Sequence, residues 1–287
     1  MLVRRKDKSE LQISTPAKIN IGLRIFGRRD DGYHEIWSIL QPIDLFDEII
    51  LQDVPDFSIS MSCDSDVVPC DAQNLCVKSA KLLQEYTQCE RGVHIHLTKN
   101  IPVGAGLGGG SSDAAATLAG LNLLWNTKLA SSTLMELAAQ IGSDVPFFLM
   151  DSTCIATGRG ERLRKINRIV SDPIVLICPA INVSTAWAYK NMKKFSLTSE
   201  TESINFQDSL ASNVLDNQQL LVNDFEEVVF ARYPVLSAHK YNLLQNGAYY
   251  ASLSGSGSSL YGIFNTIGEA RKAAEELKNN IIIYILR

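Results

Sequence analysis

The sequence predicts an α+β protein in which strands and helices mix without a regular alternation. Segments of period two, two glycine-rich stretches and amphipathic helical segments follow one another along the chain, with no internal repeat. The chain has 287 residues, of which 46% are hydrophobic, and this length suits one large domain or two ordinary ones. A buried-type strand at 173–179 opens a new unit, so we place the domains at 1–160 and 161–287.

The first expected element is a strand at 17–25, which a hairpin connects to a second extended stretch at 33–45. Apolar residues occupy every second position of the first strand, which puts Lys18 and Asn20 together on its other face. The run Arg-Arg-Asp-Asp-Gly at 28–32 marks the turn. The pattern predicts a half-buried strand on which Lys18 and Asn20 share the free face.

The remaining elements follow from hydrophobic period and from turn residues. Along the chain they are a helix at 74–89, a strand at 93–99, a helix at 113–124 opened by Ser111 and Ser112, a helix at 131–141 capped by Ser131 or Ser132, an apolar strand after Asp144, a turn through Gly158 and Gly160, the strand at 173–179, an exposed polar insertion at 196–219, a glycine- and serine-rich loop within 248–264, a helix at 269–277 and a strand at 281–286.

Composition excludes several classes of protein. The net charge of −4 lacks the basic footprint of a nucleic-acid-binding protein. The 6 cysteines form no C-x-x-C pair and the 4 histidines fall at no zinc spacing, so we expect reduced thiols in a cytoplasmic protein. The first twenty residues contain no apolar signal region, and the apolar runs are shorter than the ~20 residues of a membrane span.

The strongest local signal is a glycine-rich loop that precedes an apolar helix. Glycine can adopt positive φ and bring backbone N–H groups against a ligand, and a helix N-terminus favours an anion. The loop therefore predicts a phosphate site formed by Pro102, Val103, Gly104, Ala105, Gly106, Leu107, Gly108, Gly109, Gly110, Ser111 and Ser112.

Two familiar phosphate motifs fit this loop poorly. A Walker A loop would place its lysine at Gly110, so the essential cation is missing. A Rossmann fingerprint fits the glycines alone, but the preceding strand at 93–99 alternates and no acidic residue follows at the expected distance. A glycine-rich turn without a ligand remains the alternative.

Two charged residues are candidates for catalysis. Asp144 stands between a glycine and an apolar run, where it could serve as a general base, an N-cap or a structural ion pair. Lys18 could neutralise charge during phosphoryl transfer, or it could simply be solvated.

Three further segments have both a functional and a structural interpretation. Tyr33 and His34 could stack on and hydrogen-bond to a heterocycle. The loop 254–259 could close over phosphates or form a tight turn. The segment 223–226, Asn-Asp-Phe-Glu, is favoured as a helix cap.

Taken in this order, these segments resemble the GHMP kinase superfamily. The resemblance rests on Pro16-Ala-Lys-Ile-Asn-Ile-Gly-Leu23, Asp31-Gly-Tyr-His-Glu35, the glycine-rich loop, Gly142-Ser-Asp-Val-Pro-Phe147 and Ser254-Gly-Ser-Gly257, and spans 16 to about 264. It implies an ATP-dependent kinase, with Mg²⁺, that phosphorylates the 2-hydroxyl of a cytidine diphosphate-linked polyol in non-mevalonate isoprenoid synthesis. The implied fold has a ribosomal protein S5 domain 2-like N-terminal half and a ferredoxin-like C-terminal half, with the site between them.

The resemblance also implies roles for the matching positions. Asp144 would be the base toward the substrate hydroxyl, Lys18 would hold that hydroxyl, and Asn20 would lie beside them. Tyr33 and His34 would bind the cytosine, and Thr185 would lie near the substrate.

For the nucleotide, the resemblance implies that the loop 102–112 cradles the ATP phosphates and that Lys99 lies near it. Asp113 is a departure from the superfamily pattern, and its charge should point away from the phosphates or toward Mg²⁺. Ser256 replaces a common threonine and keeps the hydroxyl. The pattern identifies no metal ligand.

Two alternatives remain. A GHMP kinase of the homoserine or mevalonate type has no evident use for Tyr33 and His34. A non-catalytic S5-like RNA-binding module is disfavoured by the acidic charge and by the retained Lys18 and Asp144. The expected partner is a small molecule rather than a nucleic acid or a membrane, and the oligomeric state, monomer or weak dimer, is left open.

Overall fold

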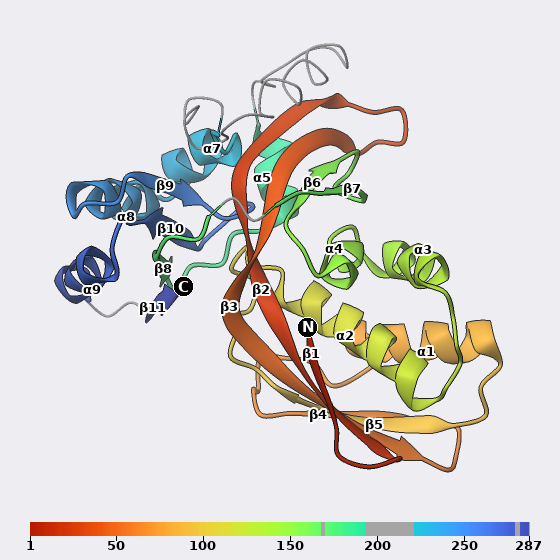
Figure 1. The fold of residues 1–287 in the computed structure, drawn as a ribbon. Coiled ribbons are helices and arrows are strands. Elements are labelled where there is room, and N and C mark those ends of the chain that lie inside the picture. Colours follow the sequence, from red (N-terminus) through yellow and green to blue (C-terminus); the bar gives the residue numbers. More distant parts are fainter. Residues whose placement is uncertain (168–169, 193–220, 279–281, 287) are drawn as a thin grey trace. The chain divides into compact units, whose positions relative to one another are not determined.

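A computed structural model describes residues 1–167, 170–192, 221–278 and 282–286 (Figure 1). The chain forms two compact units. Unit 1 comprises 1–17, 44–103 and 108–151, and unit 2 comprises 18–43, 104–107 and the chain from 152 onward. The division therefore runs through two long strands and the glycine-rich loop. The boundary at residue 160 stays a prediction, and the polar insertion expected at 196–219 lies outside the described residues.

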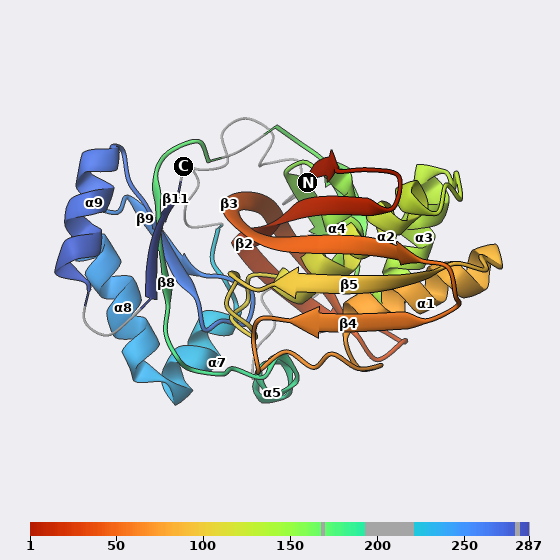
Figure 2. The ribbon, with the colours of Figure 1, turned by 90° about the horizontal axis from the view of Figure 1, so that it is seen from below.

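The strands of unit 1 belong to a sheet with the order β1-β2-β3-β5-β4 (Figure 2). Its strands are β1 (Leu2–Arg5), β2 (Glu10–Arg28), β3 (His34–Val54), β4 (Ile59–Cys63) and β5 (Gly92–Thr98). The β4–β5 pair is parallel, whereas β1–β2 and β3–β5 are antiparallel. The predicted hairpin is confirmed, with strands longer than the expected 17–45 range.

Four helices of unit 1 follow in the order α1 (Leu75–Thr87), α2 (Gly109–Leu124), α3 (Ser131–Ile141) and α4 (Val145–Met150). The first three lie on one face of the sheet (Figure 2). Helix α2 approaches the sheet closely at Gly120, where a Cβ would lie 2.4 Å from the Ile13 side chain and 2.5 Å from that of Leu51. Glycine at this position therefore lets the helix that follows the glycine-rich loop pack against the strands.

Unit 2 contains a four-stranded antiparallel sheet with the order β11-β8-β10-β9. Its elements are β8 (Ile174–Cys178), α5 (Thr185–Asn191), α7 (Phe225–Arg232), α8 (Pro234–Gln245), β9 (Tyr250–Leu253), β10 (Leu260–Ile263), α9 (Ile267–Glu276) and β11 (Ile282–Leu286). The succession βαββαβ in this strand order is the ferredoxin-like arrangement. The sequence prediction for this part of the chain is confirmed.

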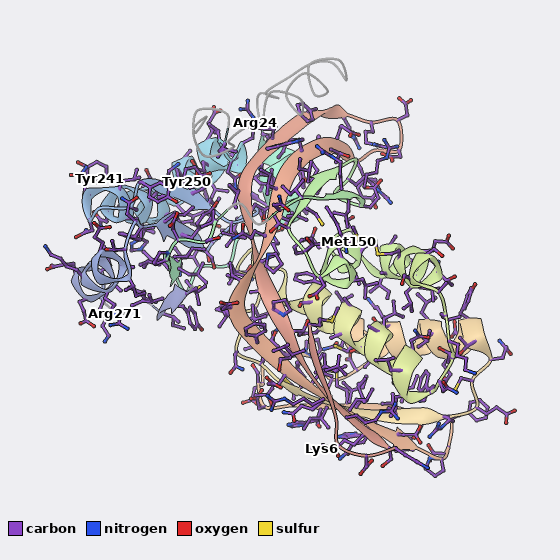
Figure 3. The ribbon with its side chains drawn as sticks, viewed as in Figure 1. Lys6, Arg24, Met150, Tyr241, Tyr250 and Arg271 are labelled. Atoms are coloured by element: carbon purple, nitrogen blue, oxygen red, sulfur yellow. The ribbon has the colours of Figure 1, made fainter. Side chains whose placement is uncertain are left out.

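The core of unit 2 lies between this sheet and helices α8 and α9. Tyr250 on β9 is buried, whereas Tyr241 and Arg271 point outward from α8 and α9 (Figure 3). Two short strands, β6 (Cys154–Thr157) and β7 (Arg162–Lys165), extend the first half of β3 through antiparallel pairing. No helix in the described residues is long and apolar enough to cross a membrane, and all six cysteines are free thiols.

Three local predictions were wrong. The apolar run after Asp144 is the helix α4, because Pro146 suits a first helical turn and a short apolar run has no decisive period. Helix α2 begins at Gly109 rather than at 113, because Gly108 adopts φ 72° and the following glycines are helical. Helix α3 begins after Ala130, so neither predicted serine is its N-cap.

Candidate active site

Lys18 and Asn20 lie together on β2, as their spacing predicts, but they are not on a free face. Each side chain is 4% exposed. Lys18 Nζ donates to Asn20 Oδ1 at 2.5 Å and to the Gly106 carbonyl at 2.9 Å, and Asn20 Nδ2 donates to Ser38 Oγ at 2.8 Å. The predicted exposure was wrong because the segment 104–107 covers this face of the strand. A buried ammonium held by hydrogen bonds is typical of a functional group rather than a solvated lysine.

The segment 104–107 is fastened to its surroundings in unit 2 by its backbone. The Lys18 N–H donates to the Leu107 carbonyl at 2.9 Å, and the Ser259 N–H donates to the Ala105 carbonyl at 3.1 Å. The Ser254 hydroxyl donates to the Gly106 carbonyl at 3.0 Å. The second glycine- and serine-rich loop therefore packs against the first one, although they are about 150 residues apart in the chain.

The backbone of the glycine-rich loop has the positive φ values that its composition predicts. Gly104, Gly106 and Gly108 adopt φ of 67°, 80° and 72°. The alternate residues Ala105 and Leu107 are buried and anchor the loop. Alternation of left-handed and other conformations turns successive N–H groups toward a concave side, a geometry that suits phosphate oxygens.

The two serines at the start of α2 have different surroundings. Ser112 is fully buried, and its hydroxyl donates to the Pro16 carbonyl at 2.6 Å and lies 2.5 Å from Thr15 Oγ1. Ser111 is half-buried, and its hydroxyl forms no hydrogen bond to a residue that the structure describes. Ser112 thus fastens the helix to β2, whereas the Ser111 hydroxyl is available to a ligand.

A buried group of three charges lies below this turn of α2. Lys99 Nζ forms ion pairs with Asp47 and, at 2.7 Å, with Asp113, and the side chains of all three are at most 6% exposed. Asp47 Oδ1 also accepts hydrogen bonds from the N–H groups of Asn100 (2.7 Å) and Ile101 (2.8 Å). The Asp113 carboxylate therefore points toward Lys99. This direction agrees with the expectation that its charge points away from the phosphates.

Burial and charge act in opposite directions within this group. Burial raises the pKa of Asp113 to about 7, although Lys99 opposes the shift. Burial alone would lower the pKa of Lys99, but Asp113 and Asp47 outweigh it and raise that pKa. Lys99 therefore stays charged at neutral pH. Sequence reasoning missed Asp47. The available signal was that Asp47 takes an inward position of β3, in the same alternating register as the buried Leu45 and Ile49.

Asp144 immediately precedes α4, and its side chain is half-buried. Its carboxylate makes no capping hydrogen bond to the helix and no hydrogen bond or ion pair with another residue of the described chain. The N-cap and salt-bridge interpretations of Asp144 therefore have no support in its contacts. An unengaged, half-buried carboxylate can accept a proton from a ligand.

Tyr33 immediately precedes β3 and His34 is its first residue, and both rings have neighbours in unit 2. The His34 ring stacks on Tyr189 of α5, with centroids 4.9 Å apart and planes at 11°, and Tyr189 meets the edge of Phe225. The Arg159 guanidinium lies over the Tyr33 ring, 4.8 Å from its centroid. Burial, and secondarily the charge of Arg28, lower the pKa of His34, so its imidazole is neutral at pH 7.

Thr185 begins helix α5, and its hydroxyl lies 2.7 Å from that of Ser256 in the second glycine- and serine-rich loop. The structure thus brings together, within unit 2, Lys18, Asn20, the segment 104–107 and the loop 254–259. It places Lys99, Ser111, Ser112 and Asp144 in unit 1. No cluster of three or more metal-ligating side chains occurs among the described residues.

Comparison with known proteins then decides the family. The sequence matches the GHMP kinases N terminal domain over residues 74–152 and the GHMP kinases C terminal domain over residues 202–283. It is 42% identical over 272 residues to 4-diphosphocytidyl-2-C-methyl-D-erythritol kinase of Prosthecochloris aestuarii, an alignment that covers 93% of each chain. The chain belongs to the GHMP kinase family.

Other GHMP kinases agree with this assignment. A relative from Thermodesulfovibrio yellowstonii with the same enzyme name is 43% identical over 263 residues, covering 90% of each chain. The crystal structure of a 4-(cytidine 5'-diphospho)-2C-methyl-D-erythritol kinase superimposes with a TM-score of 0.78 at 31% identity, covering 96% of this chain and 98% of the other. Homoserine kinase from Cytophaga hutchinsonii has a TM-score of 0.76 at 19% identity, over 100% of this chain and 97% of the other, which shows the shared fold alone. The predicted two-domain α+β GHMP kinase fold is confirmed.

Proposed function

We propose that this chain transfers the γ-phosphate of ATP to the 2-hydroxyl of 4-diphosphocytidyl-2-C-methyl-D-erythritol, in the non-mevalonate isoprenoid pathway. Relatives that carry this enzyme name align with nine tenths of the chain. The observation that carries the proposal is the buried Lys18 ammonium, which Asn20 and the Gly106 carbonyl hold against the glycine-rich loop. A kinase needs a fixed positive charge at this kind of loop, because negative charge moves between phosphate oxygens during transfer.

Asp144 and Lys18 are the proposed catalytic residues. The Asp144 carboxylate takes the proton of the substrate hydroxyl, whose oxygen forms a bond to the γ-phosphorus. The bond from the γ-phosphorus to the bridging oxygen breaks, and ADP leaves. Lys18 holds the reacting hydroxyl and offsets the charge that develops on the phosphoryl group, and Asn20 fixes the direction of the ammonium.

The proposed ATP site is the loop from Pro102 to Ser112. Its alternating positive φ values suit contact between backbone N–H groups and phosphate oxygens. We assign Ser112 a backbone contact and Ser111 a hydroxyl contact, in keeping with their different surroundings. Lys99 is assigned a supporting role from the buried group of charges beneath α2. Its ion pair with Asp113 keeps that carboxylate directed away from the nucleotide.

Mg²⁺ is the proposed metal. Mg²⁺ binds few protein groups and keeps its waters and substrate phosphates, so a site without a preformed carboxylate cluster is compatible with it. The half-buried Ser111 hydroxyl is an oxygen that no described residue engages, and it would serve as a protein ligand to the ion. Bound there, the ion would neutralise phosphate charge.

The cytidine group of the substrate is assigned to Tyr33 and His34. The neutral His34 imidazole can both donate to and accept from the edge of a cytosine. Tyr33 is 54% exposed and presents a ring for stacking. Thr185 supplies a hydroxyl on the same unit. Tyr189, which sequence reasoning missed, holds the plane of His34.

The remaining proposals concern the whole chain. We assign the kinase to the cytoplasm, with domains at 1–160 and 161–287, with a small-molecule substrate and without nucleic-acid or membrane partners. The net charge of −4 supports the part of this assignment that excludes a nucleic-acid partner.

The test is ADP release from MgATP with each of three acceptors: 4-diphosphocytidyl-2-C-methyl-D-erythritol, mevalonate and homoserine. Release with the cytidyl substrate alone is expected. Release with mevalonate or homoserine alone would keep the kinase assignment and overturn the substrate. No release from folded protein would favour a binding module, which should then bind nucleic acid with a steep dependence on salt.

A further inference from the structure

The segment Asn223-Asp-Phe-Glu226 is predicted from the sequence as a helix cap, and part of it serves as one. Helix α7 begins at Phe225, and the Oδ1 of Asn223 accepts a hydrogen bond from the Phe225 N–H at 3.0 Å. This bond needs only the oxygen of the Asn223 amide. The amide nitrogen is therefore not explained by capping.

The Asn223 amide nitrogen bridges two carbonyls of a distant loop. Nδ2 donates to the carbonyls of Leu253 and Gly255, both at 2.8 Å, and the residue is 1% exposed. These carbonyls flank Ser254, whose hydroxyl bonds to Gly106 in the glycine-rich loop. One buried side chain thus ties the start of α7 to the loop that packs against the proposed phosphate site.

Two neighbours of Asn223, Asp224 and Glu226, also hold the segments on either side of the start of α7. The Asp224 carboxylate accepts from the Ile25 N–H at 2.7 Å and pairs with Arg24 of β2 at 3.2 Å. Glu226 accepts from the Leu253 N–H at 3.0 Å. Strand β2, which carries Lys18, and the loop after β9 are therefore both fixed by the polar side chains of Asn223, Asp224 and Glu226 around the start of α7.

Gly255, whose carbonyl Asn223 holds, lies beside the proposed catalytic lysine. A Cβ built on Gly255 would lie 3.5 Å from both Lys18 Nζ and Asn20 Oδ1, and 3.3 Å from the Gly106 carbonyl. The Gly255 peptide therefore lies directly beside the proposed catalytic lysine. Because a peptide is planar and trans C=O and N–H bonds point in opposite directions, fixing the Gly255 carbonyl toward Asn223 aims the N–H of Ser256 away from it.

We infer that Asn223 is a positioning residue for phosphoryl transfer, which acts through the Gly255 peptide on the surroundings of Lys18. The inference rests on the proposed function for its kinetic meaning. Asn223 itself touches neither substrate nor nucleotide in this account. It acts by holding the Gly255 peptide in a fixed orientation beside the Lys18 ammonium.

Asn223→Asp separates this role from capping. The Asp side chain keeps the oxygen that accepts from Phe225, so α7 and the contact of Phe225 with Tyr189 are retained. It replaces the donating nitrogen with an oxygen that repels both loop carbonyls. Asn242→Asp, the same change at an exposed position of α8, is the matched control.

The expected kinetic result for Asn223→Asp is a fall in kcat of at least about tenfold, with the KM for the cytidyl substrate within about twofold of wild type. Asn242→Asp should leave both constants unchanged. Asn223→Ala replaces Asn223→Asp in the same assay if the buried charge prevents folding. A folded variant at Asn223 with wild-type kcat, or an equal loss in the control, would overturn the inference.

Hydrogen exchange measured by mass spectrometry gives a second readout that does not depend on activity. The peptide that covers 252–259 should exchange faster in the Asn223 variant, while those of α8 and α9 stay protected. Faster exchange throughout unit 2 would instead show a general loss of stability and overturn the positioning role. If wild-type protein releases no ADP, the proposed function fails, and exchange alone still decides whether Asn223 holds the loop.

Discussion

The substitution Gly106→Ala tests whether the glycine-rich loop must lie against the loop at 254–259. Gly106 has φ of 80°, and a Cβ there would lie 2.1 Å from the Ser254 carbonyl oxygen and 3.0 Å from that of Gly257. Both obstacles are backbone atoms, so no side-chain rotation relieves the clash. The two loops have to separate by roughly 1 Å to restore ordinary contact.

The size of the effect follows from the contacts that this movement breaks. A left-handed conformation costs alanine about 1–2 kcal/mol. Loss of the bond from the Ser254 hydroxyl to Gly106 adds about 1 kcal/mol, and loss of the bond from the charged Lys18 adds about 1.5–3 kcal/mol. The total of about 3.5–6 kcal/mol corresponds to a roughly 300- to 30,000-fold smaller population of the native loop arrangement.

Gly104→Ala is the matched control in the same loop. Gly104 has φ of 67°, but the nearest atom to its Cβ would be Asn182 Oδ1 at 3.6 Å, which is ordinary contact. This variant therefore carries the conformational strain without the clash, and we expect its kcat/KM to fall only about tenfold. We expect a fall of at least about 100-fold for Gly106→Ala in the same ADP-release assay. Losses that agree within about threefold for the two variants would refute the reasoning, because strain alone would then explain both.

Three further predictions concern charged residues. Asp144→Asn should lower kcat by about 10²–10⁴-fold with ATP affinity unchanged by equilibrium titration, and near-normal turnover would exclude a general base there. Lys18→Met should lower kcat by at least about 100-fold in the same assay, and activity within tenfold of wild type would show that the buried ammonium has no catalytic part. Burial raises the pKa of Asp113 from its ordinary value of 3.8 to about 7, so the folded protein binds an extra proton between these values. Its free energy of unfolding therefore falls as pH rises through this window. Asp113→Asn should therefore cost less stability at about pH 8 than at about pH 5 in urea unfolding, and a cost that grows with pH would contradict the raised pKa.

The sequence alone was sufficient for features that depend on local period or on backbone freedom. Alternation on β2 placed Lys18 and Asn20 on one face, and their side chains are hydrogen-bonded to each other. Glycine content predicted positive φ in the loop, which Gly104 and Gly106 adopt. These predictions succeed because side-chain direction and allowed φ are set by a residue and its immediate neighbours.

Local sequence failed where two structures satisfy the same short pattern. The six residues 145–150 are uniformly apolar, so period could not distinguish the strand that we expected from the helix α4. The start of α2 was misplaced for a related reason, since Gly109 and Gly110 are poor helix formers by composition. Packing and the left-handed Gly108 override that weak preference.

Only the tertiary structure decided the chemical environment of the candidate residues. Burial of Lys18 depends on the segment 104–107, which is distant in the chain, and the role of Asn223 depends on carbonyls about 30 residues away. The direction of Asp113 likewise depends on Lys99 and Asp47. Charge, burial and hydrogen bonding are properties of neighbours in space, and a linear pattern contains the residues of a site without stating which of them will meet.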